Sequence, residues 1–194
     1  MGFLLSKGAN APVPVGAARL RVVFDSTAGP ELDASALLFT EAGRVGGDAD
    51  FVFYNQPVSP DGAVRHLGRN GRADAVEVDL GRLPASVMTV AFAASTDGAP
   101  IGRIAGLALR VLDGAGRELF RFDITDTTTE TAFVFGELYR RAGAWKFRAV
   151  GQGWASGLAG LATDYGITVD DPPAPSIPSP AISRAKSVRC TRVR

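Results

Sequence analysis

The sequence is poor in the residues that build disulfide-stabilised or histidine-rich metal proteins. Its 194 residues include one cysteine, Cys190, and one histidine, His66. A single cysteine excludes an internal disulfide, and it fits a reducing compartment without identifying a function. Zinc and copper centres draw mainly on His and Cys side chains, so these counts disfavour both metals.

Long hydrophobic runs are also missing. No apolar stretch approaches the ~20 residues that cross a bilayer, so we expect no membrane span. The first seven residues, MGFLLSK, contain too short an apolar segment for a secretory signal peptide. We therefore predict a cytoplasmic protein.

Net charge is nearly absent, at +1 at pH 7. This value hides an asymmetry, because residues 183–194 hold five basic residues and no acid. The rest of the chain is therefore weakly acidic, and we expect that the folded domain does not bind nucleic acid. From residue 169 the sequence is rich in Pro, Ser and Arg and poor in large apolar groups. We predict one folded domain over 1–168 and a disordered tail over 169–194.

Glycine and proline are frequent, at 23 and 12 residues, and the apolar segments between them are short. Segments with β-branched, aromatic or alternating patterns predict about nine strands. A helix is expected after them, because Leu158, Leu161, Ala162 and Tyr165 have helical spacing between a possible cap, Ser156, and Gly166. The pattern predicts a mainly β fold, a sandwich of two antiparallel sheets with one or two short helices. The expected strands cover residues 20–24, 36–40, 51–55, 76–80, 87–94, 107–112, 118–124, 131–140 and 144–150.

Acidic residues are unevenly distributed. Six acids and one base, Arg44, lie between Asp25 and Asp50. If strand ends gather such carboxylates at one rim of a sandwich, their oxygens suit a hard cation such as calcium. Solvated turn residues are the alternative, because Asp favours turns and caps. A second group over residues 123–131 could bind another ion, or it could be a polar loop of Asx and ST turns.

Catalysis has little support. His66 has no nucleophile pattern nearby, and the sequence lacks nucleophile-elbow, zincin and phosphate-loop motifs. A metal-assisted hydrolase would need an open coordination position and a base, for which only His66 or a spare carboxylate is available.

Several segments resemble the TerD family of tellurium-resistance and stress proteins. The similarity covers about residues 3–168, and its longest segments lie near the end of the folded part. The matching segments are LSKGAN (5–10), LDASA (32–36), GDADFVFYNQ (47–56), DIT (123–125), TETA (129–132), FGELYR (135–140) and WKFRAVGQG (145–153).

The resemblance implies a β-sandwich with two bound calcium ions. It also implies roles in tellurite resistance, stress response or surface signalling complexes, and no established enzyme activity. On this basis Asp25, Asp33, Asp48, Asp50 and Asn55 match family positions. Glu31 stands where the family has Asp, Phe24 replaces a Trp, and Glu130 and Glu137 also match.

One departure bears directly on calcium. The family's acidic loop before the alternating strand is replaced by GRNGRAD over residues 68–74, in which only Asp74 keeps a carboxylate and Arg69 and Arg72 are new. Each lost carboxylate removes a ligand, so we expect weakened affinity, one lost ion or a mainly structural site.

We therefore predict a non-enzymatic calcium-binding stress protein that acts as a scaffold or interaction module with protein partners. Two alternatives stay open: a metal-independent module in which Arg69 and Arg72 replace an ion, and a metal-assisted hydrolase. The predicted calcium ligands are Asp25, Glu31, Asp33, Asp48, Asp50, Asn55, Asp74 and Glu130.

Overall fold

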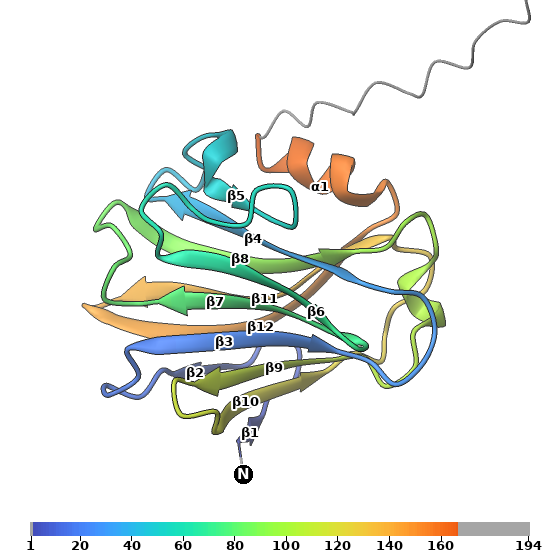
Figure 1. Cartoon of the computed structure of the whole chain (residues 1–194), viewed down its shortest axis with the longest axis horizontal. Helices are drawn as coiled ribbons and strands as arrows, with labels where there is room; N and C mark the ends of the chain where they lie inside the picture. Colours follow the sequence, from blue (N-terminus) through green and yellow to red (C-terminus); the bar gives the residue numbers. More distant parts are fainter. Residues whose placement is uncertain (1, 167–194) are drawn as a thin grey trace, which may run out of the picture.

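The structure, a computed structural model that describes residues 2–166, consists of two six-stranded sheets packed face to face and one α-helix (Figure 1). Neighbouring strands are antiparallel, except that β1 runs parallel to β10. The predicted mainly β sandwich is confirmed. The tail predicted over 169–194 lies outside the described residues.

The first sheet has the order β1-β10-β9-β3-β7-β6, and the second has the order β2-β12-β11-β8-β4-β5. In the first sheet the bounds are β1 Phe3–Leu4, β10 Glu118–Asp123, β9 Ala108–Asp113, β3 Arg19–Asp25, β7 Ala73–Asp79 and β6 Val64–Asn70. In the second they are β2 Asn10–Pro12, β12 Ala144–Trp154, β11 Ala132–Arg141, β8 Val87–Ser95, β4 Asp33–Thr40 and β5 Phe51–Val52. The helix α1 spans Gly157–Asp164, and two 3-10 turns, η1 and η2, span Asp48–Asp50 and Ile101–Arg103.

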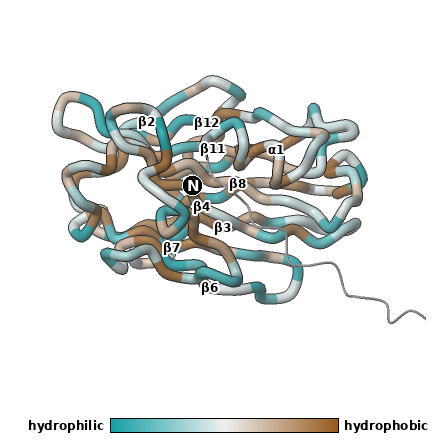
Figure 2. The backbone as a smooth tube through the Cα atoms, turned by 90° about the horizontal axis from the view of Figure 1, so that it is seen from above, coloured by the Kyte–Doolittle hydropathy of each residue, from teal (hydrophilic) through white to brown (hydrophobic). Residues whose placement is uncertain are grey.

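The main core lies between the sheets and is filled by alternate residues of each strand. In β7 the buried positions include Val76 and Val78, which are fully inaccessible, while their neighbours face outward. Phe24 and Phe135 meet edge to face with ring centroids 5.1 Å apart. Hydrophobic segments accordingly run through the body of the molecule, and many of the hydrophilic ones lie in peripheral turns (Figure 2). Burial of this apolar surface is the main force that holds the two sheets together.

A second, smaller core lies on the outer face of the second sheet. There Leu161 and Ala162 of α1 pack with Leu37, Ala91 and Val134. Gly166, with φ of 75°, follows the helix as expected, whereas the side chain of Ser156 makes no capping hydrogen bond. No helix within residues 2–166 combines the length and the apolar character that crossing a membrane requires.

Three sequence expectations are corrected by the structure. The strand predicted over 51–55 is paired with β4 only at Phe51 and Val52, and the chain then turns back on itself through Phe53 and Gln56. The segment read as a loop over 68–74 is mostly strand, because β6 and β7 form a hairpin whose turn contains Gly71 with φ of 60°. The short strands β1 and β2 were not predicted.

Candidate functional site: an arginine-held rim

One end of the sandwich carries the loop between β3 and β4, which contains the predicted ligand Glu31 and leads into another, Asp33, the first residue of β4. The guanidinium of Arg69, at the end of β6, lies among the oxygens of this loop. It forms an ion pair with Glu31, and its Nη2 donates to Asp33 Oδ1 at 2.7 Å and to the Leu32 carbonyl at 3.0 Å. A single monovalent cation thus contacts two carboxylates and one carbonyl, an oxygen set of the kind that calcium uses.

A second arginine of the same hairpin holds the start of the loop. Arg72 Nη2 donates to the carbonyl of Gly29 at 2.6 Å and to that of Pro30 at 3.4 Å. We call Arg69 and Arg72, together with loop residues 29–33, the arginine latch. The latch joins the β6–β7 hairpin of the first sheet to the chain entering β4 of the second.

A surface pocket of about 430 Å³ adjoins the latch. Its charged groups are the carboxylates of Glu31, Asp33 and Asp97 and the guanidinium of Arg69. Negative charge is therefore in excess there, although Arg69 already occupies the position between two of the three acids.

Asp74 lies beneath the latch, inside the protein. Its Oδ2 accepts from the backbone N–H of Ala34 at 2.8 Å and lies 3.0 Å from Nε2 of His66, while Oδ1 accepts from the N–H of Ala75. The side chains of Asp74 and His66 are 3% and 7% exposed. Asp74 therefore links β7 to β4 across the core, and its oxygens face protein donors.

Asp25 faces away from this core. Its carboxylate pairs with Arg110 Nη1 at 3.4 Å, and Arg110 Nε donates to Glu118 at 2.8 Å. The hydrogen bond that Arg110 donates to Glu118, more than the one that it donates to Asp25, raises the pKa of Arg110. Asp25 thus belongs to an ion-pair network on the outer face of the first sheet.

Asp48, Asp50 and Asn55 lie around η1 and β5. The side chain of Gln56 fastens this segment by donating to the carbonyls of Asp48 and Phe51, at 2.7 and 2.6 Å. Burial raises the pKa of the Asp50 carboxyl, and the negative charge of Asp61 raises it further. Asp50 is thus the predicted ligand whose surroundings most clearly lack a positive charge.

Glu130 closes a polar turn. Its carboxylate accepts from the N–H of Thr128 at 2.6 Å, and this backbone hydrogen bond is the main reason that the pKa of Glu130 is lowered. Asp126 of the same loop pairs with Lys7 Nζ at 3.1 Å. These contacts match the polar-loop interpretation of residues 123–131.

The eight predicted ligands therefore lie in several separate settings. Within residues 2–166, no group of three or more His, Cys, Asp and Glu side chains is arranged to hold a metal ion. At Glu31 and Asp33 the residues present do not fit calcium, because the guanidinium fills the space between them. The calcium site predicted from all eight ligands stays a prediction.

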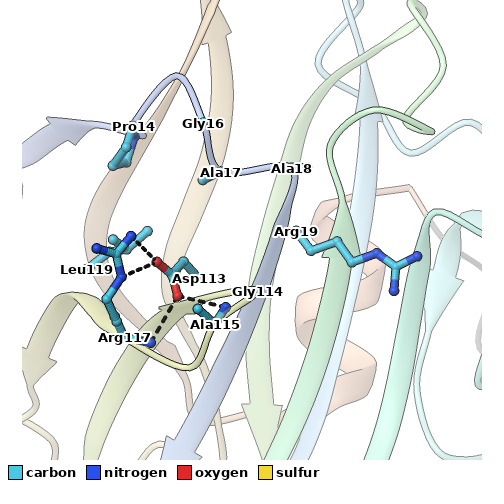
Figure 3. Close-up of a pocket in the computed structure, with 10 residues that line it drawn as sticks. All are labelled: Pro14, Gly16, Ala17, Ala18, Arg19, Asp113, Gly114, Ala115, Arg117 and Leu119. Carbon is cyan, nitrogen blue, oxygen red and sulfur yellow. Dashed lines mark hydrogen bonds and ion pairs between the residues drawn. The ribbon is translucent and has the colours of Figure 1, made fainter.

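At the opposite end of the first sheet, one acid, Asp113, has a purely structural role. Another pocket of about 430 Å³ lies between the segment entering β3 and the β9–β10 turn (Figure 3). There Asp113 accepts from the N–H groups of Ala115 and Arg117 and from the Arg117 side chain, while Arg19 points away. These bonds, above all the one from the Arg117 N–H, lower the pKa of Asp113. The role of Asp113 in holding this turn was not predicted, although the Asp-Gly-Ala-Gly pattern is typical of an Asx turn.

Comparison with known proteins decides the family. A family model described as the TerD domain matches residues 1–165. The tellurium resistance protein TerD of Serratia marcescens is 40% identical over 189 residues, covering 86% of this chain and 98% of that protein. The chain belongs to the TerD family.

Other similar proteins include a stress protein and a solved structure. General stress protein 16U of Bacillus subtilis is 37% identical over 152 residues, covering 72% of this chain and 79% of that protein. A crystal structure of a telluride resistance protein homologue from Streptomyces coelicolor A3(2) matches with a TM-score of 0.63 and 22% identity, over 76% of this chain and 96% of that one. That structure supports the fold alone.

Proposed function

We propose that this TerD-family chain is a non-catalytic resistance and stress-response protein that works by binding protein partners in the cytoplasm. In this proposal the arginine latch, and not a calcium ion, fixes the β3–β4 loop. The observation that carries the proposal is the contact of Arg69 with Glu31, Asp33 and the Leu32 carbonyl at one point.

A guanidinium can take over a structural cation's position because its planar fork donates to several oxygens at once. Arg69 already donates to two carboxylates and a carbonyl, and calcium would need 6–8 oxygens in their place. A bound calcium would also have to displace the Arg69 guanidinium, which the chain itself holds beside these oxygens. The loop is therefore ordered whether or not calcium is present.

We propose a non-catalytic protein because His66, a candidate base, is buried. A hydrolase using this rim would need an accessible base, but the His66 side chain is only 7% exposed and lies against Asp74. The carboxylates of Glu31 and Asp33 are paired with Arg69. His66 and Asp74 instead form part of the polar link between the two sheets. No observation favours the hydrolase.

Calcium binding is the second candidate function, and one observation favours it. The pocket beside the latch contains three carboxylates and one guanidinium, so it retains an excess of negative charge. In this version Glu31, Asp33 and Asp97 would attract a calcium ion weakly, at the surface.

Thermal unfolding in calcium and in chelator separates the two candidates. A ligand that binds only the native state raises its stability by mass action. We expect the wild-type Tm to be the same in millimolar calcium and in EDTA. A Tm several degrees higher in calcium would contradict the latch and favour the second candidate.

The resistance role needs its own test. Expression of the wild-type chain in a tellurite-sensitive bacterial host should raise the tellurite concentration that the host survives. The control is Asp74→Ala, which removes the buried carboxylate that links the sheets. Equal survival of cells with the wild-type chain and with an empty vector would contradict the resistance role.

A further inference from the structure

A second cluster of arginines lies near the far end of the first sheet, away from the latch. It surrounds a pocket of about 250 Å³ beside Gly62, just before β6. Arg65 reaches the pocket from β6, Arg82 from the chain that follows β7, and Arg19 from β3. Three segments far apart in the sequence therefore bring guanidinium groups to one place.

Two of these guanidinium groups face the same small volume. A Cβ atom placed on Gly62 would lie 3.1 Å from Arg82 Nη2 and 3.6 Å from Arg65 Nη2. Gly62 has φ of 69°, a conformation that other residues rarely adopt, and its lack of a side chain lets the two guanidinium groups approach the backbone closely. We call the adjoining cavity of about 250 Å³ the Arg65–Arg82 pocket.

The charges around the Arg65–Arg82 pocket are only partly balanced. Its two carboxylates, Glu77 and Asp79, pair with Arg19 at 3.9 and 3.3 Å. Arg82 donates to the Asp61 carbonyl at 3.0 Å, and within residues 2–166 neither Arg65 nor Arg82 has an ion pair with a carboxylate. Two adjacent guanidinium groups repel each other, and a bound anion would turn this repulsion into attraction.

From this arrangement we propose that the Arg65–Arg82 pocket binds a small oxyanion of the phosphate class. Each guanidinium presents a planar set of N–H donors that matches the oxygens of a phosphoryl group. The nearby Glu77 and Asp79 hold Arg19 and set a limit on affinity, since they repel the same anion. The ligand is either free inorganic phosphate or a phosphoryl group on a larger molecule, and both share this chemistry.

The first probe is inorganic phosphate, which is titrated into the wild-type chain while the backbone amide signals are monitored by NMR. Saturable shifts are expected near residues 61–65 and 79–82, and sodium chloride at matched ionic strength should not reproduce them. Because each variant removes charge-assisted hydrogen bonds to the anion, Arg65→Gln and Arg82→Gln should each weaken binding about tenfold or more. The matched control is Arg103→Gln, which removes the same charge from η2.

O-phosphoserine is the second probe and separates the two sources. Tighter binding of phosphoserine supports a phosphorylated partner, and tighter binding of inorganic phosphate supports the free ion. No saturable shift with either probe would overturn the proposal. Equal binding by the wild-type chain and the Arg65→Gln, Arg82→Gln double variant would also overturn it, provided that the double variant keeps the wild-type Tm.

Discussion

Two loops of this protein are each held by arginine, and they differ in how the arginine reaches them. In the β9–β10 turn, Arg117 bonds to Asp113 four residues away, and the Asp113 side chain is only 8% exposed. In the arginine latch, Arg69 pairs with Glu31 across 38 residues, and the Glu31 side chain is 69% exposed. The turn is built by local chemistry, whereas the latch exists only once the two sheets have packed. The contacts of the latch therefore depend on packing between the sheets, whereas those of the turn do not.

The largest loss of stability is expected from substitution of Asp74, which is buried beneath the latch. Asp74→Ala would leave the buried N–H of Ala34 and the partly buried N–H of Ala75 without this acceptor, and loss of a buried partner costs about 1–3 kcal/mol. We expect a loss of roughly 3 kcal/mol or more in urea unfolding. The milder control, Asp74→Asn, keeps one acceptor oxygen and should lose less. A loss below about 0.5 kcal/mol for Asp74→Ala would show that the link between the sheets is not held here.

The β9–β10 turn can be tested by pH. The folded-state pKa of Asp113 is lowered, so its contribution to stability is present above the unfolded pKa, near 3.8, and is lost as pH falls through the folded value. Asp113→Asn should therefore be less stable than wild type at pH 7, and the two should converge in strong acid. A stability difference that does not change between pH 7 and pH 2 would mean that the charge of Asp113 does not hold the turn.

The latch itself should contribute less to stability, because its ion pairs are exposed. Arg69→Ala should lower the free energy of unfolding by about 1 kcal/mol, since exposed pairs contribute about 0.2–1 kcal/mol and the bond to the Leu32 carbonyl adds to them. The matched control is Arg121→Ala, which removes one ion pair, to Asp123, on the outer face of the same sheet. Equal losses in the two variants would contradict a special role for the latch.

The smallest effect is expected at Asp50. Burial and the charge of Asp61 raise its pKa, so the ionised carboxylate opposes folding as pH rises through its folded pKa. Asp50→Asn should therefore raise the Tm slightly at pH 7, with no gain at pH 3. A lower Tm for this variant at pH 7 would indicate that a cation normally offsets the charge of Asp50, as the calcium prediction requires.

Much of the fold could be predicted, because strand alternation and turn chemistry are local. The alternating pattern of residues 76–80 corresponds to β7. The strands expected over 107–112, 118–124, 131–140 and 144–150 correspond to the antiparallel pairs β9–β10 and β11–β12. The β6–β7 hairpin was missed although Asn70-Gly71 is a hairpin signal, because residues 64–70 contain few apolar side chains. The edge strands β1 and β2 are only two and three residues long, too short for a pattern.

The candidate site was harder to predict, because it depends on which oxygens meet which donors. The sequence alone marks Arg69 and Arg72 as departures from the family pattern and as possible replacements for an ion. The burial of Asp74 and the pairing of Asp25 with Arg110 have no sequence signal, because strand register and sheet packing decide these positions. The Arg65–Arg82 pocket left no sequence signal, since its residues come from three separate segments.

Calcium titration by isothermal calorimetry would show whether Arg69 stands in place of a metal ion. We expect no saturable heat when calcium is added to the wild-type chain at millimolar concentration. We also expect weak calcium binding by Arg69→Ala, in which Glu31, Asp33 and Asp97 lose their tethered cation. Stoichiometric calcium binding by the wild-type chain, with an affinity that Arg69→Ala leaves unchanged, would contradict the claim that arginine has taken the cation's place.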